Sequence, residues 1–179
     1  MGTRQAILVL GMHRSGTSTV TRVLSMLGAA LPARLMPAAK ANELGFFEPD
    51  AIVRIHDTLL ERVGSSWHDH RPLDLAGPAR DEAVHALAEA MGHDYGDAPL
   101  AVVKDPRICR LLPLWRNVLA QVGREPLAVL VHRPATEVAA SLTARDHLPG
   151  EQGLLLWLRH ALEAEFHSRT MPRFILSYD

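Results

Sequence analysis

An apolar run of strand length that leads directly into a glycine-rich loop constrains the fold of this chain more than any other feature. The run covers residues 6–10, and the loop that follows reads GMHRSGTS over residues 11–18. A short strand that is apolar at every position is typical of a parallel sheet buried on both faces. After the loop, apolar residues recur at helical spacing from Val20 to Leu27, and Gly28 ends the series. The chain is therefore predicted to open with a strand, a loop and a helix.

The same alternation continues along the chain. Further apolar runs of strand length are found at residues 100–103, 127–131 and 174–178. Apolar residues that recur every three or four positions predict helices over 51–63, 79–91, 111–122, 136–145 and 154–167. Strands that alternate with helices of this length predict an α/β fold, in which a central, mostly parallel sheet forms the middle of a three-layer α/β/α sandwich.

Composition and charge narrow the class of protein. With 179 residues, of which 47% are hydrophobic and 22% charged, the chain is expected to form one domain over 1–179. A net charge of -1 gives no overall attraction to nucleic acid or to an anionic membrane, so neither is expected as a partner. No run approaches the roughly 20 apolar residues of a membrane span. The single Cys109 cannot form an internal disulfide, and a cytoplasmic location is expected.

The glycine-rich loop nearly matches the phosphate-binding pattern G-x-x-x-x-G-K-[ST], but Thr17 stands in the lysine position. Between a strand and a helix, two glycines let successive backbone N–H groups point at one anion. In nucleoside triphosphate enzymes the lysine reaches the β- and γ-phosphates, and the last hydroxyl holds Mg²⁺. Here the cation of the loop is Arg14, whose guanidinium can clamp an oxygen of a shorter anion. The loop predicts a phosphate-type site, and a turn without a ligand is the alternative.

The sequence H-R-S-G-T-S after a first strand resembles the 5′-phosphosulfate loop of sulfotransferases that use 3′-phosphoadenosine 5′-phosphosulfate (PAPS). The resemblance implies a P-loop NTPase-like sandwich adapted to a phosphate with a sulfuryl group, generally without a required metal ion. Arg14 occupies the position where that family places Lys or Arg against the leaving phosphate. The resemblance assigns donor binding to six loop residues: His13, Arg14, Ser15, Gly16, Thr17 and Ser18.

A second match follows the predicted strand at 127–131. His132-Arg133-Pro134, with Ser141 eight residues after Arg133, resembles the element of the same family that binds the 3′-phosphate of the donor. Arg133 can make paired charge-assisted hydrogen bonds to a phosphate, and Ser141 lies about two helical turns further along. Taken alone, the pair can also be an ordinary surface arginine and a helix serine.

Two further stretches are similar to bacterial members of the family: NELGFFEPD at 42–50 and VVKDPR at 102–107. Transfer to an alcohol needs a base for the hydroxyl proton and cations for the charge on the departing phosphate. Glu48 is the first candidate for the base, and a helix N-terminal charge is its alternative role. Asp105 is the second candidate. Lys104 can bond the sulfuryl or bridging oxygens, and Pro106 near the position of the family's histidine argues against a histidine base.

These observations together predict a PAPS-dependent sulfotransferase that acts on a hydroxyl of a carbohydrate or small metabolite by in-line displacement at sulfur. Two alternatives stay open: a P-loop nucleotide kinase or NTPase, and a nucleotide-binding module without catalysis. His68 and His70 have no identifiable third ligand, so no metal site is expected. In the family, a helix and a basic loop follow the strand that ends in Tyr-Asp. The domain is therefore expected to lack its C-terminal cofactor-closing segment.

Overall fold

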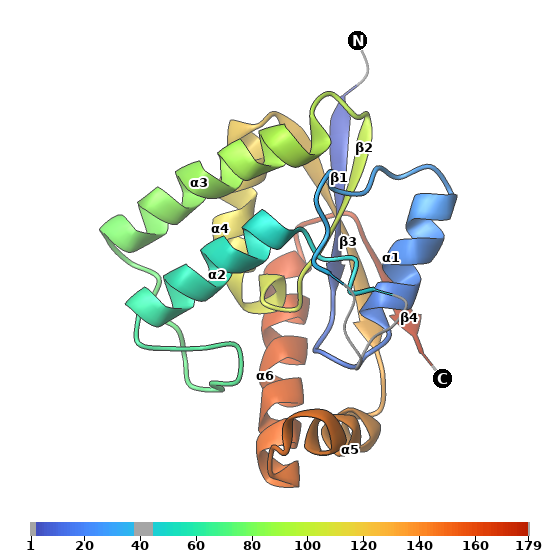
Figure 1. Ribbon diagram of the computed structural model, residues 1–179, viewed down its shortest axis with the longest axis vertical. Coiled ribbons are helices and arrows are strands. Elements are labelled where there is room, and N and C mark those ends of the chain that lie inside the picture. Colours follow the sequence, from blue (N-terminus) through green and yellow to red (C-terminus); the bar gives the residue numbers. More distant parts are fainter. Residues whose placement is uncertain (1–2, 38–44, 179) are drawn as a thin grey trace.

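The computed structural model describes residues 3–37 and 45–178. Four parallel strands form one sheet in the order β2-β1-β3-β4 (Figure 1). Their bounds are β1 (Arg4–Leu10), β2 (Leu100–Lys104), β3 (Arg124–His132) and β4 (Arg173–Ser177). Ile7 of β1 pairs with Val102 of β2 and with Leu127 of β3. The central parallel sheet is confirmed, and the carboxyl ends of its strands meet at one edge.

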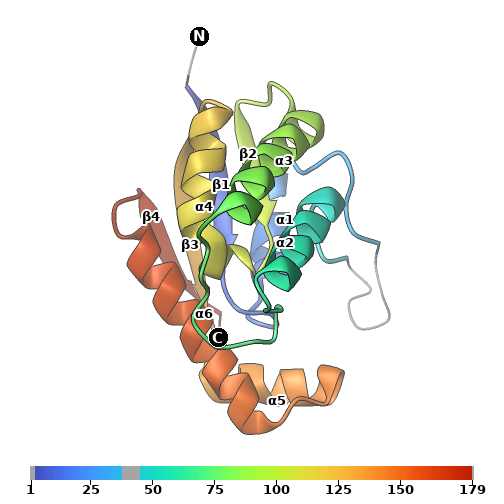
Figure 2. The ribbon, with the colours of Figure 1, turned by 90° about the vertical axis from the view of Figure 1, so that its left-hand side faces the viewer.

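Helices cover both faces of the sheet, which confirms the three-layer α/β/α sandwich. Helix α1 (Thr17–Met26) packs on one face, against β1 and β2, while α4 (Ile108–Gln121) and α6 (Gly150–Ser168) pack on the other. Helices α2 (Asp50–Arg62) and α3 (Pro78–Tyr95) extend the layer formed by α4, and α5 (Ala135–Asp146) packs on α6 at the bottom of the domain (Figures 1 and 2).

The predicted elements are all present, with ends that differ by a few residues. Helix α6 begins at Gly150, four residues before the first apolar residue of its periodic pattern, because its first turn is polar and carries no apolar signal. Strand β3 begins at Arg124 rather than at residue 127 for the same reason. None of the helices within 3–37 and 45–178 is both long and apolar enough to cross a lipid bilayer.

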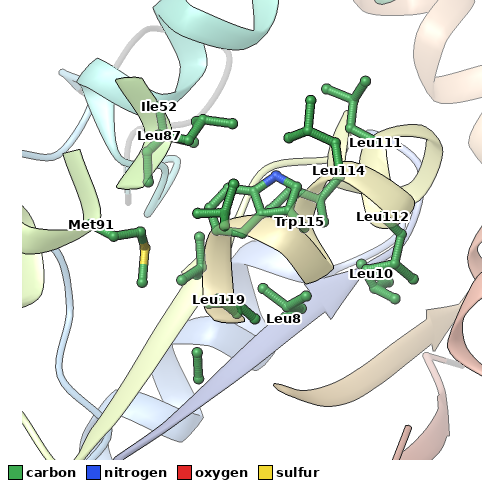
Figure 3. Close-up of a cluster of buried hydrophobic side chains, with 14 of the residues drawn as sticks. Leu8, Leu10, Ile52, Leu87, Met91, Leu111, Leu112, Leu114, Trp115 and Leu119 are labelled. Atoms are coloured by element: carbon green, nitrogen blue, oxygen red, sulfur yellow. The ribbon is translucent and has the colours of Figure 1, made fainter. Parts of the chain in front are cut away.

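Alternate residues of β1 point into two separate cores, as expected for a strand buried on both faces. Leu8 and Leu10 face the larger core, where the fully buried Trp115 of α4 packs among leucines of α4 and residues of α2 and α3 (Figure 3). Ile7 and Val9 face the smaller core, which α1 covers. Full burial of side chains of this size contributes roughly 1.5–3 kcal/mol each, so the position of β1 is strongly determined. This strand carries the glycine-rich loop at its carboxyl end.

Candidate functional site

The loop between β1 and α1 fits its surroundings only because it contains glycine at two positions. Gly16 has φ +86°, and a Cβ atom there would overlap the ring of Tyr178. A Cβ on Gly11 would lie 2.9 Å from the backbone oxygen of Val131, and the Gly11 N–H donates to Cys109 Sγ at 3.1 Å. The loop is thus pressed between β3, the residue after β4 and the start of α4. The tight turn of the loop brings the backbone N–H groups at the start of α1 toward one point, which is the arrangement that binds an anion.

A polar cavity of about 230 Å³ opens beside this loop at the carboxyl edge of the sheet. Of the predicted site residues, eight line it: His13, Arg14, Gly16, Thr17, Ser18, Glu48, Lys104 and Arg133. The positive charges come from Arg14, Lys104, Arg133 and Arg145, against the carboxylate of Glu48. This balance attracts an anion. Ser15 faces a neighbouring apolar cavity of about 220 Å³ between β3 and α6 instead.

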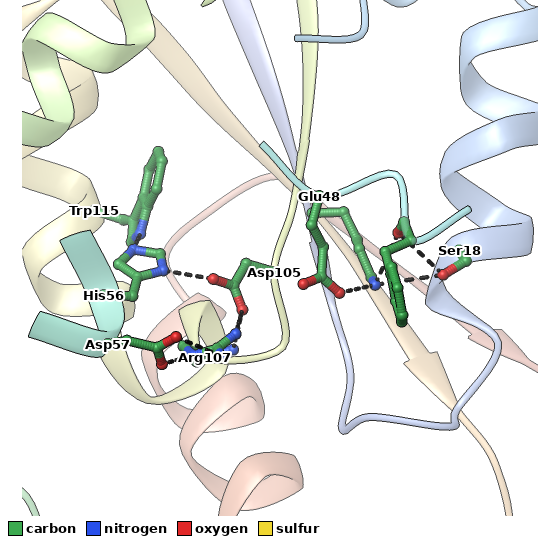
Figure 4. A network of polar contacts seen from close by, with 9 residues as sticks. Ser18, Glu48, His56, Asp57, Asp105, Arg107 and Trp115 are labelled. Atoms are coloured by element: carbon green, nitrogen blue, oxygen red, sulfur yellow. Dashed lines mark hydrogen bonds and ion pairs between the residues drawn. The ribbon is translucent and has the colours of Figure 1, made fainter. Parts of the chain in front are cut away.

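Lys104 and Glu48 form a buried ion pair in the wall of this cavity, with each side chain only 4% exposed. Lys104 Nζ also donates to the backbone oxygen of Phe46 at 3.1 Å and to Ser18 Oγ at 3.4 Å (Figure 4). The Ser18 hydroxyl in turn donates to the same oxygen of Phe46. Burial raises the pKa of Glu48, and the opposing charge of Lys104 only partly offsets this effect. Residues 42–44, at the start of the stretch that contains Glu48, lie outside the described part of the chain.

Asp105 points away from the cavity, into the core behind it (Figure 4). His56 Nδ1 lies 2.7 Å from one of its carboxylate oxygens, and Arg107 donates to the other at 2.9 Å. The Trp115 indole can only donate, and it bonds His56 Nε2 at 2.9 Å, so the proton of the ring is on Nδ1. Burial disfavours ionisation of Asp105, but Arg107 and His56 outweigh it and hold its pKa well below the usual range. Arg107 also binds Asp57. The second candidate base therefore lies outside the cavity, with both oxygens engaged.

The two motifs that resemble donor-binding elements meet, although Arg14 and Arg133 are far apart in the sequence. Arg14 Nε donates to Ser141 Oγ at 2.8 Å, and Arg133 donates to the backbone oxygen of Arg14 at 2.8 Å. Arg133 also pairs with Glu137 one helical turn away, and its guanidinium lies over the ring of Tyr178. Ser141 does not line the cavity, but it contacts a residue that does. The structure thus gathers both motifs at one end of the sheet.

Two features of the cavity were not predicted from the sequence. Arg145 lines it, one helical turn after Ser141 on α5, and this spacing on a predicted helix could have identified it. The second feature is the state of His13, whose Nε2 atom is buried and has no hydrogen-bond partner among the described residues. Burial, and then the charges of Arg107, Lys104 and Arg145, lower the pKa of His13 well below its usual value, so the ring is neutral at pH 7.

Comparisons with known proteins identify no family for this chain. No protein-family model matches the sequence, and no curated protein matches it. Among solved structures, the chain is similar to a "putative kinase" from Chloroflexus aurantiacus, with 12% identity, a TM-score of 0.47, and coverage of 98% of this chain and 89% of that one. It is also similar to TT1252 from Thermus thermophilus, with 17% identity, a TM-score of 0.46, and coverage of 99% and 90%. Neither match assigns a function to this chain.

Proposed function

We propose that this domain binds PAPS and transfers its sulfuryl group to a hydroxyl acceptor, a carbohydrate or small metabolite. The observation that carries this proposal is the position of Lys104, whose ammonium group lies 3.4 Å from Ser18 Oγ. In loops that bind nucleoside triphosphates, the corresponding hydroxyl holds Mg²⁺. A side-chain cation at this place can neutralise a short phosphosulfate, and Thr17 stands where a triphosphate would need a lysine.

The residues around the loop fit the two anionic ends of such a donor. Backbone N–H groups of residues 16–18 and the Arg14 guanidinium would hold the 5′-phosphosulfate. The N–H of Ser15, predicted from the sequence to share this role, instead donates to the backbone oxygen of Met12 at 3.1 Å. Arg133 and Ser141 would hold the 3′-phosphate. Ser141 Oγ now accepts a hydrogen bond from Arg14, so donor binding would exchange this bond for contacts to phosphate oxygens.

The proposed reaction is an in-line displacement at sulfur. The acceptor oxygen forms a bond to sulfur, the bond from sulfur to the bridging oxygen breaks, and its electron pair leaves on the phosphate of 3′,5′-ADP. Glu48 takes the hydroxyl proton, a role that suits a carboxylate whose pKa is raised by burial. Lys104 and Arg14 stabilise the negative charge that develops on the leaving phosphate.

Phosphoryl transfer from a nucleoside triphosphate is the second candidate. The observation that favours it is the spacing of Gly11, Gly16 and Ser18, which matches the phosphate-binding pattern of kinases and NTPases. This function would require a divalent ion beside Ser18, where Lys104 Nζ now lies.

A thermal-shift comparison of 3′,5′-ADP, ADP and ATP, with and without Mg²⁺, separates the two candidates. A ligand at one hundred times its Kd stabilises a protein by about 2.7 kcal/mol. We expect the largest shift with 3′,5′-ADP and no effect of Mg²⁺. Arg133→Ala should weaken 3′,5′-ADP far more than 5′-AMP, while Arg62→Gln, at an exposed arginine of α2, serves as the control. A larger shift with ATP and Mg²⁺ would favour phosphoryl transfer.

A further inference from the structure

The loop that joins α2 to α3 is fixed to the domain at four successive carbonyl oxygens, those of residues 68–71. Gln152 of α6 donates to the first, and Arg159 of α6 donates to the third. The buried Arg110 of α4 donates to the second and the fourth, and all four distances lie between 2.5 and 3.1 Å. Irregular segments are usually the mobile parts of a fold. Here the four hydrogen bonds hold the loop, and with it the preceding residue, Trp67, in a defined place.

Trp67 contacts two residues that line the polar cavity beside the glycine-rich loop. Its ring meets the ring of His13 edge-on, with centroids 4.8 Å apart, and the Arg145 guanidinium carbon lies 5.9 Å from its centroid. His13 and Arg145 both line the cavity that also contains Glu48. We call these two cavity-lining residues the His13–Arg145 wall.

His13 offers this wall a neutral hydrogen-bonding group. Its Nε2 atom is buried and lacks a partner within the described ranges, and a buried polar atom of this kind calls for a ligand atom or water. A neutral imidazole has one donor nitrogen and one acceptor nitrogen. Whether Nε2 is the donor or the acceptor of the ring, a hydroxyl group can pair with it, because a hydroxyl both donates and accepts. A phosphate oxygen can only accept, so it pairs with Nε2 in one of the two cases.

Arg145 offers the wall a cation that the proposed donor contacts do not use. Its guanidinium pairs with the neighbouring Asp146 at 2.7 Å, and both side chains are partly exposed at 20% and 24%. Because Arg145 lines the cavity, a ligand anion that enters it can join Asp146 beside the guanidinium. The planar guanidinium matches carboxylate and sulfate groups through two parallel hydrogen bonds.

From this arrangement we propose that the His13–Arg145 wall binds the acceptor, and that the acceptor is a hydroxyl compound carrying an oxyanion, such as a sugar acid. The inference rests on the proposed function. Arg145 holds the carboxylate of the acceptor, and His13 Nε2 bonds one of its hydroxyl groups. The acceptor is thereby oriented in the same cavity as Glu48, the proposed proton acceptor.

Isothermal titration calorimetry on protein saturated with 3′,5′-ADP tests this assignment. The probes are two matched pairs, glucuronate with glucose and galacturonate with galactose, because the members of each pair differ in one carboxylate. We expect each acid to bind about tenfold more tightly than its neutral partner, as a charge-assisted pair provides. Arg145→Gln should abolish this preference and Arg145→Lys should keep part of it. His13→Gln should weaken both members equally, and Arg62→Gln is the matched arginine control.

Several results would overturn the inference. The acid and the neutral sugar of each pair could bind equally or not at all, or the preference could survive in Arg145→Gln. A third is that Arg145→Gln weakens 3′,5′-ADP as much as Arg133→Ala does, which would place Arg145 in the donor site. Failure of the unmodified protein to bind 3′,5′-ADP would refute the proposed function instead, and the inference with it.

Discussion

Acidification from pH 7 to pH 5 is expected to destabilise the domain through His160, a residue of α6 with a side chain buried in the core. Burial, together with the nearby charge of Arg110, lowers the pKa of His160 to about 4, from the ordinary value of 6.5. Its Nδ1 lies 2.8 Å from the Leu156 backbone oxygen, so this nitrogen carries the proton of the neutral ring. Between pH 6.5 and pH 4, the unfolded chain therefore binds a proton that the folded domain excludes. The free energy of unfolding therefore decreases as the pH is lowered through this window.

The two pKa values set the size of the effect. Linkage between them gives a loss of about 2 kcal/mol from pH 7 to pH 5, and about 3 kcal/mol once the pH falls below 4. The window above pH 5 is the informative one, because most carboxylates titrate below it. His160→Gln removes the titrating group while keeping a polar side chain. His93→Gln on the exposed face of α3 is the matched control.

Urea unfolding followed by tryptophan fluorescence at pH 7, 6 and 5 measures these differences. The unmodified protein and His93→Gln should lose stability in parallel, and His160→Gln should lose about 2 kcal/mol less. An equal loss in His160→Gln would show that His160 accepts its proton without unfolding. His13, whose pKa burial also lowers, should give a second set of differences when His13→Gln is compared with the unmodified protein.

Three further outcomes are expected. Glu48→Gln should lower the free energy of unfolding in urea by about 3 kcal/mol, because it leaves the buried ammonium of Lys104 without its counter-charge. Under conditions where the variant is still folded, its rate of sulfuryl transfer should fall by about a hundredfold or more, and a normal rate would contradict the role of Glu48 as the base. Gly11→Ala should lower the free energy of unfolding by about 1–3 kcal/mol and weaken the binding of 3′,5′-ADP in calorimetry, because the added Cβ would meet Val131. A Cβ on Gly92 in α3 would meet nothing within 4 Å, so Gly92→Ala is the control and should be tolerated. Cys109 is buried, and burial raises the pKa of its thiol to about 12. A thiol reagent should therefore label Cys109 only as urea unfolds the domain, and rapid labelling in native buffer would contradict this packing.

The fold was predictable because the signals that determine it are local. The continuous apolar pattern of β1 and the three- and four-residue spacing of the helices predict parallel strands covered on both faces. The meeting of the two motifs also followed, because parallel strands bring their carboxyl ends to one edge. Arg14 and Arg133 each follow a strand of this sheet, and they lie in contact through the Arg14 backbone oxygen.

The roles within the KDPR stretch could not be read from residue types alone. Lys104 and Asp105 are adjacent charged residues, and the resemblance treated both as cavity residues. At the end of a strand, however, neighbouring side chains point to opposite sides. Lys104 accordingly faces the cavity and Asp105 faces the core. The partner of Asp105 is His56, a histidine on the buried face of α2, and nothing in the sequence links two residues 49 positions apart.

The stretch from Lys104 to Cys109 contributes to the shape of the polar cavity because it bonds the glycine-rich loop at both ends. Cys109 Sγ accepts the N–H of Gly11, where the loop begins, and Lys104 Nζ donates to Ser18, where it passes into α1. Between them, Asp105 is bonded to the core on both carboxylate oxygens. The two ends of the loop are therefore bonded to one segment, which is itself bonded to the core through Asp105. If this cavity binds the proposed donor, it would be largely organised before the ligand arrives, so little binding energy would be spent on ordering it, and the buried charge of Asp105 would act without touching the ligand.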